Sequence, residues 1–437
     1  MVADANAPRR PPLGLATAIA LVAGNMIGSG LFLLPASLAP YGPAALLGWT
    51  ASALGGLALA CVFAQLCRRL PRHGGPYAFA RDAFGDGVGF AVAWSYWIST
   101  WCANAAIAVA FAGYFGALFP AASATPLRAM TSALAALWAC TLANALGVRS
   151  AGRVQLVTTV LKLLPLFVLS LLALPAVFEP AAWQPFNRSA ASLPSVMLTT
   201  MALTLWAFLG VESATVVGQE VDNPQRNLPR ATLAGSMLAI IATVASCTVV
   251  AAIVPAAVLA TSEAPFALAA SRLWGNGAGL VFAATAAIAC FGALNGWVLM
   301  QGQLPLAAAR DGVFPPLFAR IDARGTPQHG LIVGSVLASL LVLANYQKDL
   351  VGLFTFSILL ATASCLLPYA VCSAAALRTR SPRERAIALF AFVFSIAALV
   401  GSGAEALLWG AALVVAGWPV YLLQRRRLAV NQPATPG

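Results

Sequence analysis

Apolar stretches long enough to cross a bilayer as helices follow one another along almost the whole chain. A helix needs about 20 apolar residues to cross the hydrocarbon core of a membrane. Charged residues make up only 9% of the 437 positions, whereas a soluble domain carries roughly a quarter of its residues as charges that face water. These features exclude a soluble globular enzyme and predict an all-α integral membrane protein.

Cuts at charges and at Gly/Pro clusters divide the chain into twelve expected transmembrane helices. The expected spans cover approximately residues 13–35, 42–67, 87–119, 127–147, 154–176, 194–219, 231–257, 275–307, 329–346, 350–376, 386–403 and 405–423. The shortest connections are expected at 346–350 and 403–405, where two spans nearly touch along the sequence.

The basic residues predict the orientation of these spans. Cytoplasmic loops of membrane proteins carry an excess of Lys and Arg. With the N-terminus in the cytoplasm, most of the 25 basic residues fall at the cytoplasmic ends of the spans. The net charge of +12 is therefore interpreted as the mark of one membrane face, with both termini cytoplasmic and no nucleic-acid partner.

Metal, disulfide and enzyme chemistry are not indicated by the sequence. The eight cysteines lie in or at the ends of apolar stretches, and they form no CxxC pair and no Cys/His cluster. The two histidines, His73 and His329, lie near span ends, and no nucleophile–base pair is expected at membrane depth. The tails are too short for a soluble sensor domain. We therefore expect no metal, no cofactor and no catalytic residues.

The first span contains a glycine-rich segment, GNMIGSG at residues 24–30, at mid-membrane depth. A glycine costs about 1 kcal/mol in the interior of a helix. Close packing against another helix would explain Gly24 and Gly28 at their four-residue spacing, but not three consecutive small residues. We favour an unwound segment, because broken helices in membrane proteins line binding cavities.

The sixth span contains a second interruption, WAFLGVES at residues 206–213, in which Gly210 precedes the carboxylate of Glu212. An acid at the bilayer centre costs about 2.5–3.5 kcal/mol on insertion scales. Glu212 could be a structural carboxylate bonded to the neighbouring broken backbone, or part of an ion or proton pathway. The second interpretation is favoured, because intramembrane acids usually have such functions.

Broken spans that are five apart indicate two inverted repeats of five helices, an arrangement typical of secondary transporters. The expected organisation is a cytoplasmic tail at 1–12, a first repeat at 13–192, a second repeat at 193–380, two accessory helices at 381–424 and a cytoplasmic tail at 425–437. Exposed N–H groups at the start of a half-helix would bind a carboxylate, and free main-chain carbonyls would bind an ammonium group. A site for an anionic group beside a site for a cationic group indicates that the substrate is an amino acid.

The two broken segments, with GGPYA at 74–78, NPQRNLP at 223–229 and DGVFPP at 311–316, resemble the amino acid–polyamine–organocation (APC) superfamily. The resemblance covers about residues 12–425. It is strongest to the bacterial basic amino acid/polyamine antiporters, and among these to the arginine/agmatine antiporters.

The resemblance implies a multi-pass transporter of a bacterial inner membrane that works by alternating access and forms a homodimer. It would exchange arginine for agmatine and so support acid resistance. Three alternatives stay open: a proton-coupled amino acid permease, a lysine/cadaverine exchanger and an ornithine/putrescine exchanger.

The resemblance also implies how the substrate would be held at its amino acid end. Ser29 and Gly30 would bind the carboxylate. The main-chain carbonyls of Met26, Trp206 and Leu209 would bind the α-amino group, and the Trp206 ring would act as a gate.

The opposite end of the substrate is assigned by the same resemblance. Asn104 would hydrogen-bond the guanidinium, and Trp297 would stack on it. A desolvated cation–π contact of this kind is worth about 2 kcal/mol. Tyr96 would cap the outer side, Glu212 would belong to the proximal gate, and Tyr77 matches a tyrosine tied to pH response.

The distal part of the expected pocket departs from the family pattern. The positions that differ are Ser99, Thr100, Ile107 and Ala361. Ala361 stands where a serine is expected, and Thr362 or Ser364 could replace that serine if the register shifts. The identity of the substrate is therefore less firmly indicated than the amino acid site. Trp101 is left open between the site and ordinary helix packing.

Overall fold

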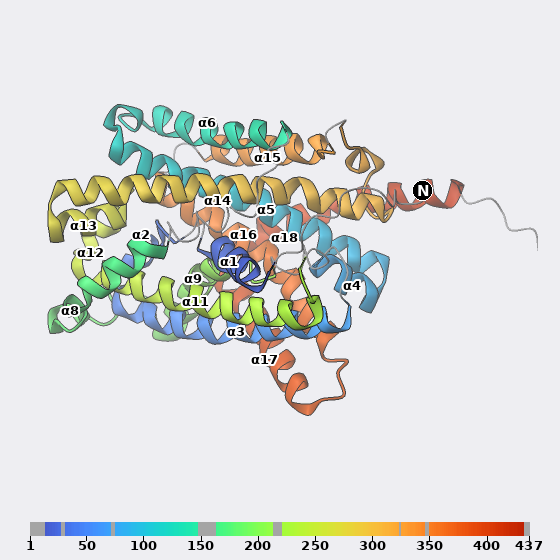
Figure 1. Ribbon diagram of the computed structural model, residues 1–437, viewed down its shortest axis with the longest axis horizontal. Coiled ribbons are helices and arrows are strands. Elements are labelled where there is room, and N and C mark those ends of the chain that lie inside the picture. The colour runs from blue at the N-terminus through green and yellow to red at the C-terminus, as the bar shows by residue number, and fades with distance from the viewer. Residues whose placement is uncertain are drawn as a thin grey trace, which may run out of the picture.

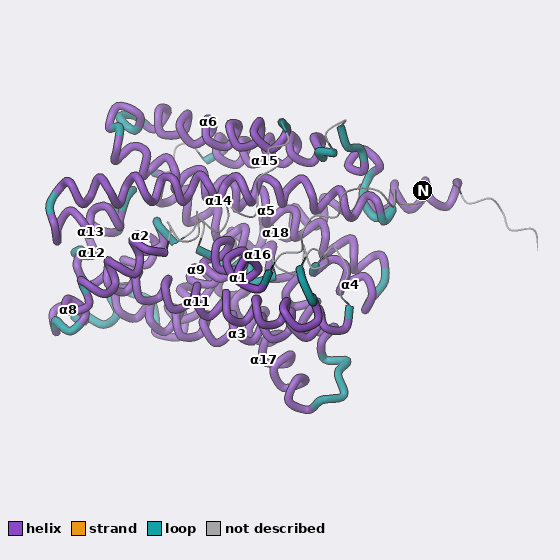
Figure 2. The backbone as a smooth tube through the Cα atoms, in the orientation of Figure 1, coloured by secondary structure: helices purple, strands orange, loops and turns teal. Residues whose placement is uncertain are grey.

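The computed structural model describes residues 14–27, 31–70, 75–146, 163–212, 221–322, 325–345 and 349–431. Within these ranges the chain folds into helices joined by short connections, without a β-strand (Figure 2). Seven of the described helices are long and apolar enough to cross a membrane, and four shorter apolar helices accompany them. The all-α membrane class is thus supported, while the count of twelve spans and the repeat stay predictions.

The described helices fall into three groups by length and hydropathy. The long apolar ones are Leu34–Arg69 (α2 Leu34–Leu38, η1 Ala39–Ala44 and α3 Ala45–Arg69), α5 Asp86–Leu118, α11 Pro224–Ile253, α14 Asn276–Arg310, α16 Leu350–Ala376, α17 Pro382–Gly401 and α18 Gly403–Asn431. The shorter apolar ones are α1 Leu15–Met26, the segment Leu163–Leu172, α9 Leu193–Leu205 with its continuation η4 Trp206–Phe208, and α15 Gln328–Ala344. The others are α4 Pro76–Phe84, α6 Pro126–Ala145, α8 Leu174–Val177, α12 Ala256–Leu259, α13 Pro265–Trp274, η2 Pro120–Ala122, η3 Pro180–Trp183 and η6 Pro316–Ala319.

The expected boundaries differ from the helices at the start of the chain. The expected first span at 13–35 is interrupted, because α1 ends at Met26 and the helix resumes at Leu34. The helix then continues to Arg69 through a kink at Gly42, whose φ of +62° favours glycine. The connection expected between the first two spans is therefore a kink rather than a loop.

Three further boundaries can be compared with the described residues, and two of them lie partly outside those residues. Of the expected fifth span at 154–176, residues 154–162 lie outside the described residues, and the helix that follows covers Leu163–Leu172. The connection at 346–350 also lies mostly outside them. The short connection at 403–405 is confirmed nearly in place, since α17 ends at Gly401 and α18 begins at Gly403.

Helix α5 forms the centre of the bundle. It packs along α14 on one side and along α16 on the other, with α6, α15 and α18 around them (Figure 1). Helices α3, α9 and α11 pack together beside this core, and α1 lies on α11 and also contacts α14. A helix that is apolar on every side is stable only when it is surrounded, which explains the central place of α5.

Small residues let these helices approach each other closely. A Cβ atom added at Gly401 of α17 would lie 2.1 Å from the carbonyl oxygen of Leu198 in α9. One added at Gly48 of α3 would lie 2.5 Å from the main-chain carbon of Thr200 in α9. Association of helices in lipid depends on such packing, because lipid is as apolar as the side chains.

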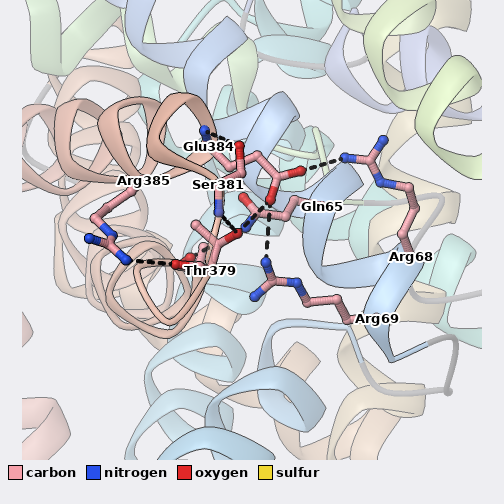
Figure 3. A network of polar contacts seen from close by, with 8 residues as sticks. Gln65, Arg68, Arg69, Thr379, Ser381, Glu384 and Arg385 are labelled. Atoms are coloured by element: carbon pink, nitrogen blue, oxygen red, sulfur yellow. Dashed lines mark hydrogen bonds and ion pairs between the residues drawn. The ribbon is translucent and has the colours of Figure 1, made fainter.

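One end of the bundle carries a network of arginines around a glutamate. Helix α4 and the connection between α16 and α17 lie at one end, called here the basic end, and α8, α12 and α13 lie at the opposite end (Figure 1). At the basic end, Arg68 and Arg69 of α3 each donate to the Glu384 carboxylate at 3.3 Å, and Thr379 Oγ1 donates to it at 2.7 Å (Figure 3). Because the arginines are about half exposed, this network joins α3 to α17 with only modest energy, about 1 kcal/mol or less per pair.

Candidate substrate-binding site

The first expected break is present where α1 stops. The helix ends at Met26, and Ile27 follows with φ −85° and ψ 27°, outside helical geometry. Both residues are buried. Ser29 and Gly30 lie outside the described residues, so their expected contact with a substrate carboxylate stays a prediction.

The second expected break is also present. Helix α9 ends at Leu205, one 3₁₀ turn follows at Trp206–Phe208, and Leu209 is extended with φ −64° and ψ 142°. Gly210 then takes φ +98°, a backbone conformation that residues with a side chain rarely adopt. Glycine at this position is what allows the chain to turn at membrane depth.

One main-chain acceptor expected to be free at this break is already used. The Trp206 carbonyl accepts a hydrogen bond from the Leu209 N–H at 3.2 Å. The expectation of a free carbonyl at Trp206 is therefore corrected, because the 3₁₀ turn occupies it. A carbonyl oxygen has two lone pairs, so a second donor can still be bound.

Glu212 lies at the end of the second break and is fully buried. Tyr96 of α5 donates its hydroxyl to Oε1, and Tyr369 of α16 donates to Oε2 at 2.5 Å. The main chain of Gly210 also hydrogen-bonds the carboxylate. The negative charge is thus compensated by hydrogen bonds, and Glu212 joins the broken segment to two central helices.

The pairing of Tyr96 with Glu212 joins two residues that the resemblance assigns to separate roles, and the expectation that Tyr96 caps the outer side of the substrate stays a prediction. Tyr369 was missed entirely. A tyrosine in the middle of an apolar span, next to Pro368, is the only sequence signal that marks it.

Two residues of the expected side-chain site, Asn104 and Trp297, come from α5 and α14, which pack along each other. Asn104 of α5 is fully buried, and Trp297 of α14 and Trp206 are nearly so. Within the described part of the chain, no hydrogen-bond partner exists for the Oδ1 atom of Asn104 or for the indole N–H groups of Trp101, Trp206 and Trp297. Buried polar groups are normally paired, so unpaired groups on these helices fit a site that a ligand completes.

The four residues of the distal wall are either apolar or already have a hydrogen-bond partner. Thr100 donates to the Trp97 carbonyl at 2.7 Å, and Ser99 hydrogen-bonds Cys365. Ile107 and Ala361 are fully buried and apolar. The polar atoms that remain come from the next residues of α16.

Those residues are Thr362 and Ser364, which were considered as replacements for the missing serine. Among the described residues their hydroxyl groups have no hydrogen-bond partner, and both side chains are buried. An apolar wall with a few hydroxyl groups fits an aliphatic stem that ends in a polar group.

Tyr77 belongs to a separate network at the basic end. Its hydroxyl donates to Asp311 Oδ2 at 3.1 Å, and Arg81 contacts both the Asp311 carboxylate at 3.2 Å and the Tyr77 oxygen at 3.3 Å. Burial raises the pKa of the Tyr77 phenol above its ordinary value, and the charge of Asp311 raises it further. The phenol therefore stays protonated in the acid and neutral range, and Tyr77 is not itself the group that would titrate there.

A cavity of about 280 Å³ opens near the opposite end of the bundle. Its lining includes Thr125, Glu263 and Asp349. Burial raises the pKa of Glu263, and the charge of Asp349 adds to this effect. Carboxylates at the entrance to a bundle attract cations through their field. Among the described residues no group of His, Cys, Asp and Glu could hold a metal ion.

A bundle of apolar helices with two breaks at its centre, and unpaired polar groups beside them, has the architecture of a secondary transporter. The amino acid permease family model matches residues 13–424 of the chain. The chain belongs to this family, and within the APC superfamily it falls among the basic amino acid/polyamine antiporters. It is therefore a multi-pass membrane protein, and its family supports the expectation of a transporter rather than an enzyme.

Three relatives illustrate the similarity. A cadaverine/lysine antiporter of Escherichia coli K12 is 35% identical over 368 residues, which cover 82% of this chain and 81% of the relative. The putrescine transporter PotE of the same organism is 32% identical over 432 residues, covering 96% and 97%. The protein of the same name from Haemophilus influenzae is 31% identical over 422 residues, covering 94% and 96%.

The Tyr77 network predicts how stability depends on pH. The pKa of the phenol is raised above the value of about 10 in an unfolded chain. Its contribution to the free energy of unfolding is therefore complete below about pH 10 and is lost as the pH rises through the folded-state pKa. Tyr77→Phe should lower the free energy of unfolding by about 1 kcal/mol at neutral pH. The variant should also lose less stability than the wild type as the pH rises into the alkaline range. Thermal unfolding in detergent at a series of pH values measures both effects. A stability difference between wild type and variant that varies in the acid range would contradict the assignment of the effect to the Tyr77 phenol.

Glu212→Gln distinguishes the two roles left open for this carboxylate. Glutamine keeps the size, but it removes the charge and puts an NH₂ donor where one tyrosine needs an acceptor. If Glu212 takes part in transport, the rate should fall about tenfold or more and its pH profile should change, beyond a stability loss of about 1.5–3 kcal/mol. Glu179→Gln, at an exposed position, serves as the control. A loss of stability with an unchanged pH profile would leave Glu212 a purely structural role.

Proposed function

We propose that this chain exchanges a cationic amino acid for the amine formed by its decarboxylation. The observation that carries the proposal is the combination of Asn104 Oδ1 and the Trp297 ring, an acceptor and an aromatic face, both buried on α5 and α14, which pack along each other. A cation over an indole gains about 2 kcal/mol without a buried counter-charge. Neutral contacts of this strength also let the substrate leave, as an exchanger requires.

The amino acid end of the substrate would meet the broken backbone. The α-amino group would bind the carbonyls of Met26 and Leu209 and the second lone pair of Trp206, and the carboxylate would bind at Ser29 and Gly30. The decarboxylated amine lacks that carboxylate but keeps both nitrogens. The site would thus hold both exchanged molecules through their cationic groups.

For the identity of the pair, we propose lysine with cadaverine, or the shorter homologues ornithine with putrescine. Relatives named for cadaverine/lysine and for putrescine support aliphatic diamines. The apolar side chains of Ile107 and Ala361 in the distal wall fit an alkyl stem, and an ammonium group needs fewer acceptors than a guanidinium. Arginine with agmatine is the second candidate, supported by the resemblance at Asn104 and Trp297.

Exchange of this kind would defend a cell against acid. The imported amino acid carries one positive charge and the exported amine carries two, so the cycle moves charge across the membrane. Decarboxylation inside the cell consumes one proton for each amino acid. This role places the protein in a bacterial inner membrane, with its basic end and both termini in the cytoplasm. It would work by alternating access of twelve helices arranged as two inverted repeats.

Exchange is tested with the purified protein in proteoliposomes. Uptake of labelled lysine should rise about tenfold or more when the vesicles contain cadaverine, relative to empty vesicles. Parallel vesicles loaded with putrescine or agmatine, and labelled arginine outside, rank the candidate pairs. Uptake that is indifferent to internal amine and follows an imposed proton gradient would instead support a proton-coupled permease.

Trp297→Leu tests the aromatic contact with the cation. Loss of about 2 kcal/mol should weaken binding of a cationic substrate about 30-fold and abolish measurable uptake. Trp274→Leu replaces an exposed tryptophan of α13 and should leave binding unchanged. Thermal shift with added lysine or cadaverine gives the affinities. Wild-type affinity in a folded Trp297→Leu protein would remove the stacking model.

A further inference from the structure

Gln301 of α14 is fully buried and holds Asn104 in place. Its Oε1 atom accepts a hydrogen bond from Asn104 Nδ2 at 2.7 Å. Its Nε2 atom donates to the Leu331 carbonyl at 3.0 Å and to Ser335 Oγ at 2.8 Å, both on α15. The side chain of Gln301 thus links α5 to α15 through α14.

The donors and acceptors in this chain of contacts can be arranged in one direction only. A main-chain carbonyl can only accept, so the atom of Gln301 that faces Leu331 must be its NH₂ group. The Gln301 oxygen then faces Asn104, which must present its own NH₂ group in return. The Asn104 oxygen is therefore directed away from Gln301, and it has no partner among the described residues.

Gln301 lies one helical turn beyond Trp297 on the same helix. Gln301 contacts Asn104 directly, so the contact that fixes the Asn104 amide is made one turn along α14 from Trp297, whose indole would cover the cation. Trp97 donates its indole N–H to the main-chain carbonyl of Gln301 at 3.0 Å, a second contact that ties α5 to this position.

We infer that Gln301 is a positioning residue that holds the Asn104 oxygen toward the substrate, so that the site selects a protonated amine at that end. The inference rests on the proposed function, in which Asn104 contacts the substrate cation. An ammonium group offers three N–H donors and no acceptor, so it binds the amide oxygen and is repelled by the amide NH₂. A hydroxyl group both donates and accepts, so it tolerates either orientation of the amide.

This difference defines the ligands for the test. Cadaverine is compared with the amino alcohol of the same chain length, in which one ammonium group is replaced by a hydroxyl. The ratio of their inhibition constants against labelled lysine reports the orientation of Asn104. A general loss of packing would weaken both ligands alike and leave the ratio unchanged.

The variants are Gln301→Met, which keeps the volume without the amide, and Gln303→Met as the control. Gln303 is half-buried on the same helix and two residues further on, so it points to a different side. Gln301→Met should reduce the preference for cadaverine about tenfold, and Gln303→Met should not change it. Ser335→Ala removes only one partner of Gln301 and should produce a smaller shift of about two- to threefold in a protein that still folds.

The outcomes distinguish a failure of the role of Gln301 from a failure of the proposed function. A preference that is unchanged in folded Gln301→Met or Ser335→Ala protein overturns the role of Gln301, even if transport is slower. Adding Asn104→Leu to Gln301→Met should cause little further change in the ratio, because both act on one oxygen. A wild-type protein that binds neither lysine nor cadaverine would refute the proposed function itself, and the inference with it.

Discussion

Inside the hydrocarbon core of a membrane a backbone polar group finds no water, so the protein must supply its partner. Broken helices are therefore tolerated only inside a bundle, and both breaks of this chain are enclosed there. Met26 and Leu209 are buried, α1 packs on α11 and α14, and the turn at Trp206–Phe208 packs against α11 and α16. The same enclosure leaves the indole N–H of Trp206, at the second break, without a hydrogen-bond partner among the described residues.

Few charged side chains lie in the described interior of the bundle. Glu212, the one fully buried carboxylate among the described residues, accepts hydrogen bonds from the hydroxyl groups of Tyr96 and Tyr369. The cation of the proposed substrate would likewise meet an indole face and an amide oxygen at Trp297 and Asn104. Hydrogen bonds and aromatic faces bind more weakly than a desolvated ion pair, and this suits a site that must bind and release two different cations in each cycle.

The fold class and the positions of both breaks could be predicted from the sequence. The hydropathy of a span is a property of the local sequence, and so is the cost of a regular helix at Gly28, Gly30 and Gly210. The substrate contacts expected of Asn104 and Trp297 stay predictions; both side chains are buried, on helices α5 and α14, which pack along each other. The kink at Gly42 was not predicted, because its φ depends on how the flanking helices pack as well as on the residue itself.

Composition, the length of the apolar stretches and the placement of glycines determined that the chain is helical, lies in a membrane and carries two interrupted helices. The tertiary structure decided which groups meet: Tyr369 with Glu212, 157 positions apart, and Gln301 with Asn104, 197 apart. It also decided that the Trp206 carbonyl is occupied and that Tyr77 pairs with Asp311. Local propensities depend on neighbours along the chain, whereas the partner of a buried polar group depends on which helices pack together and in what register.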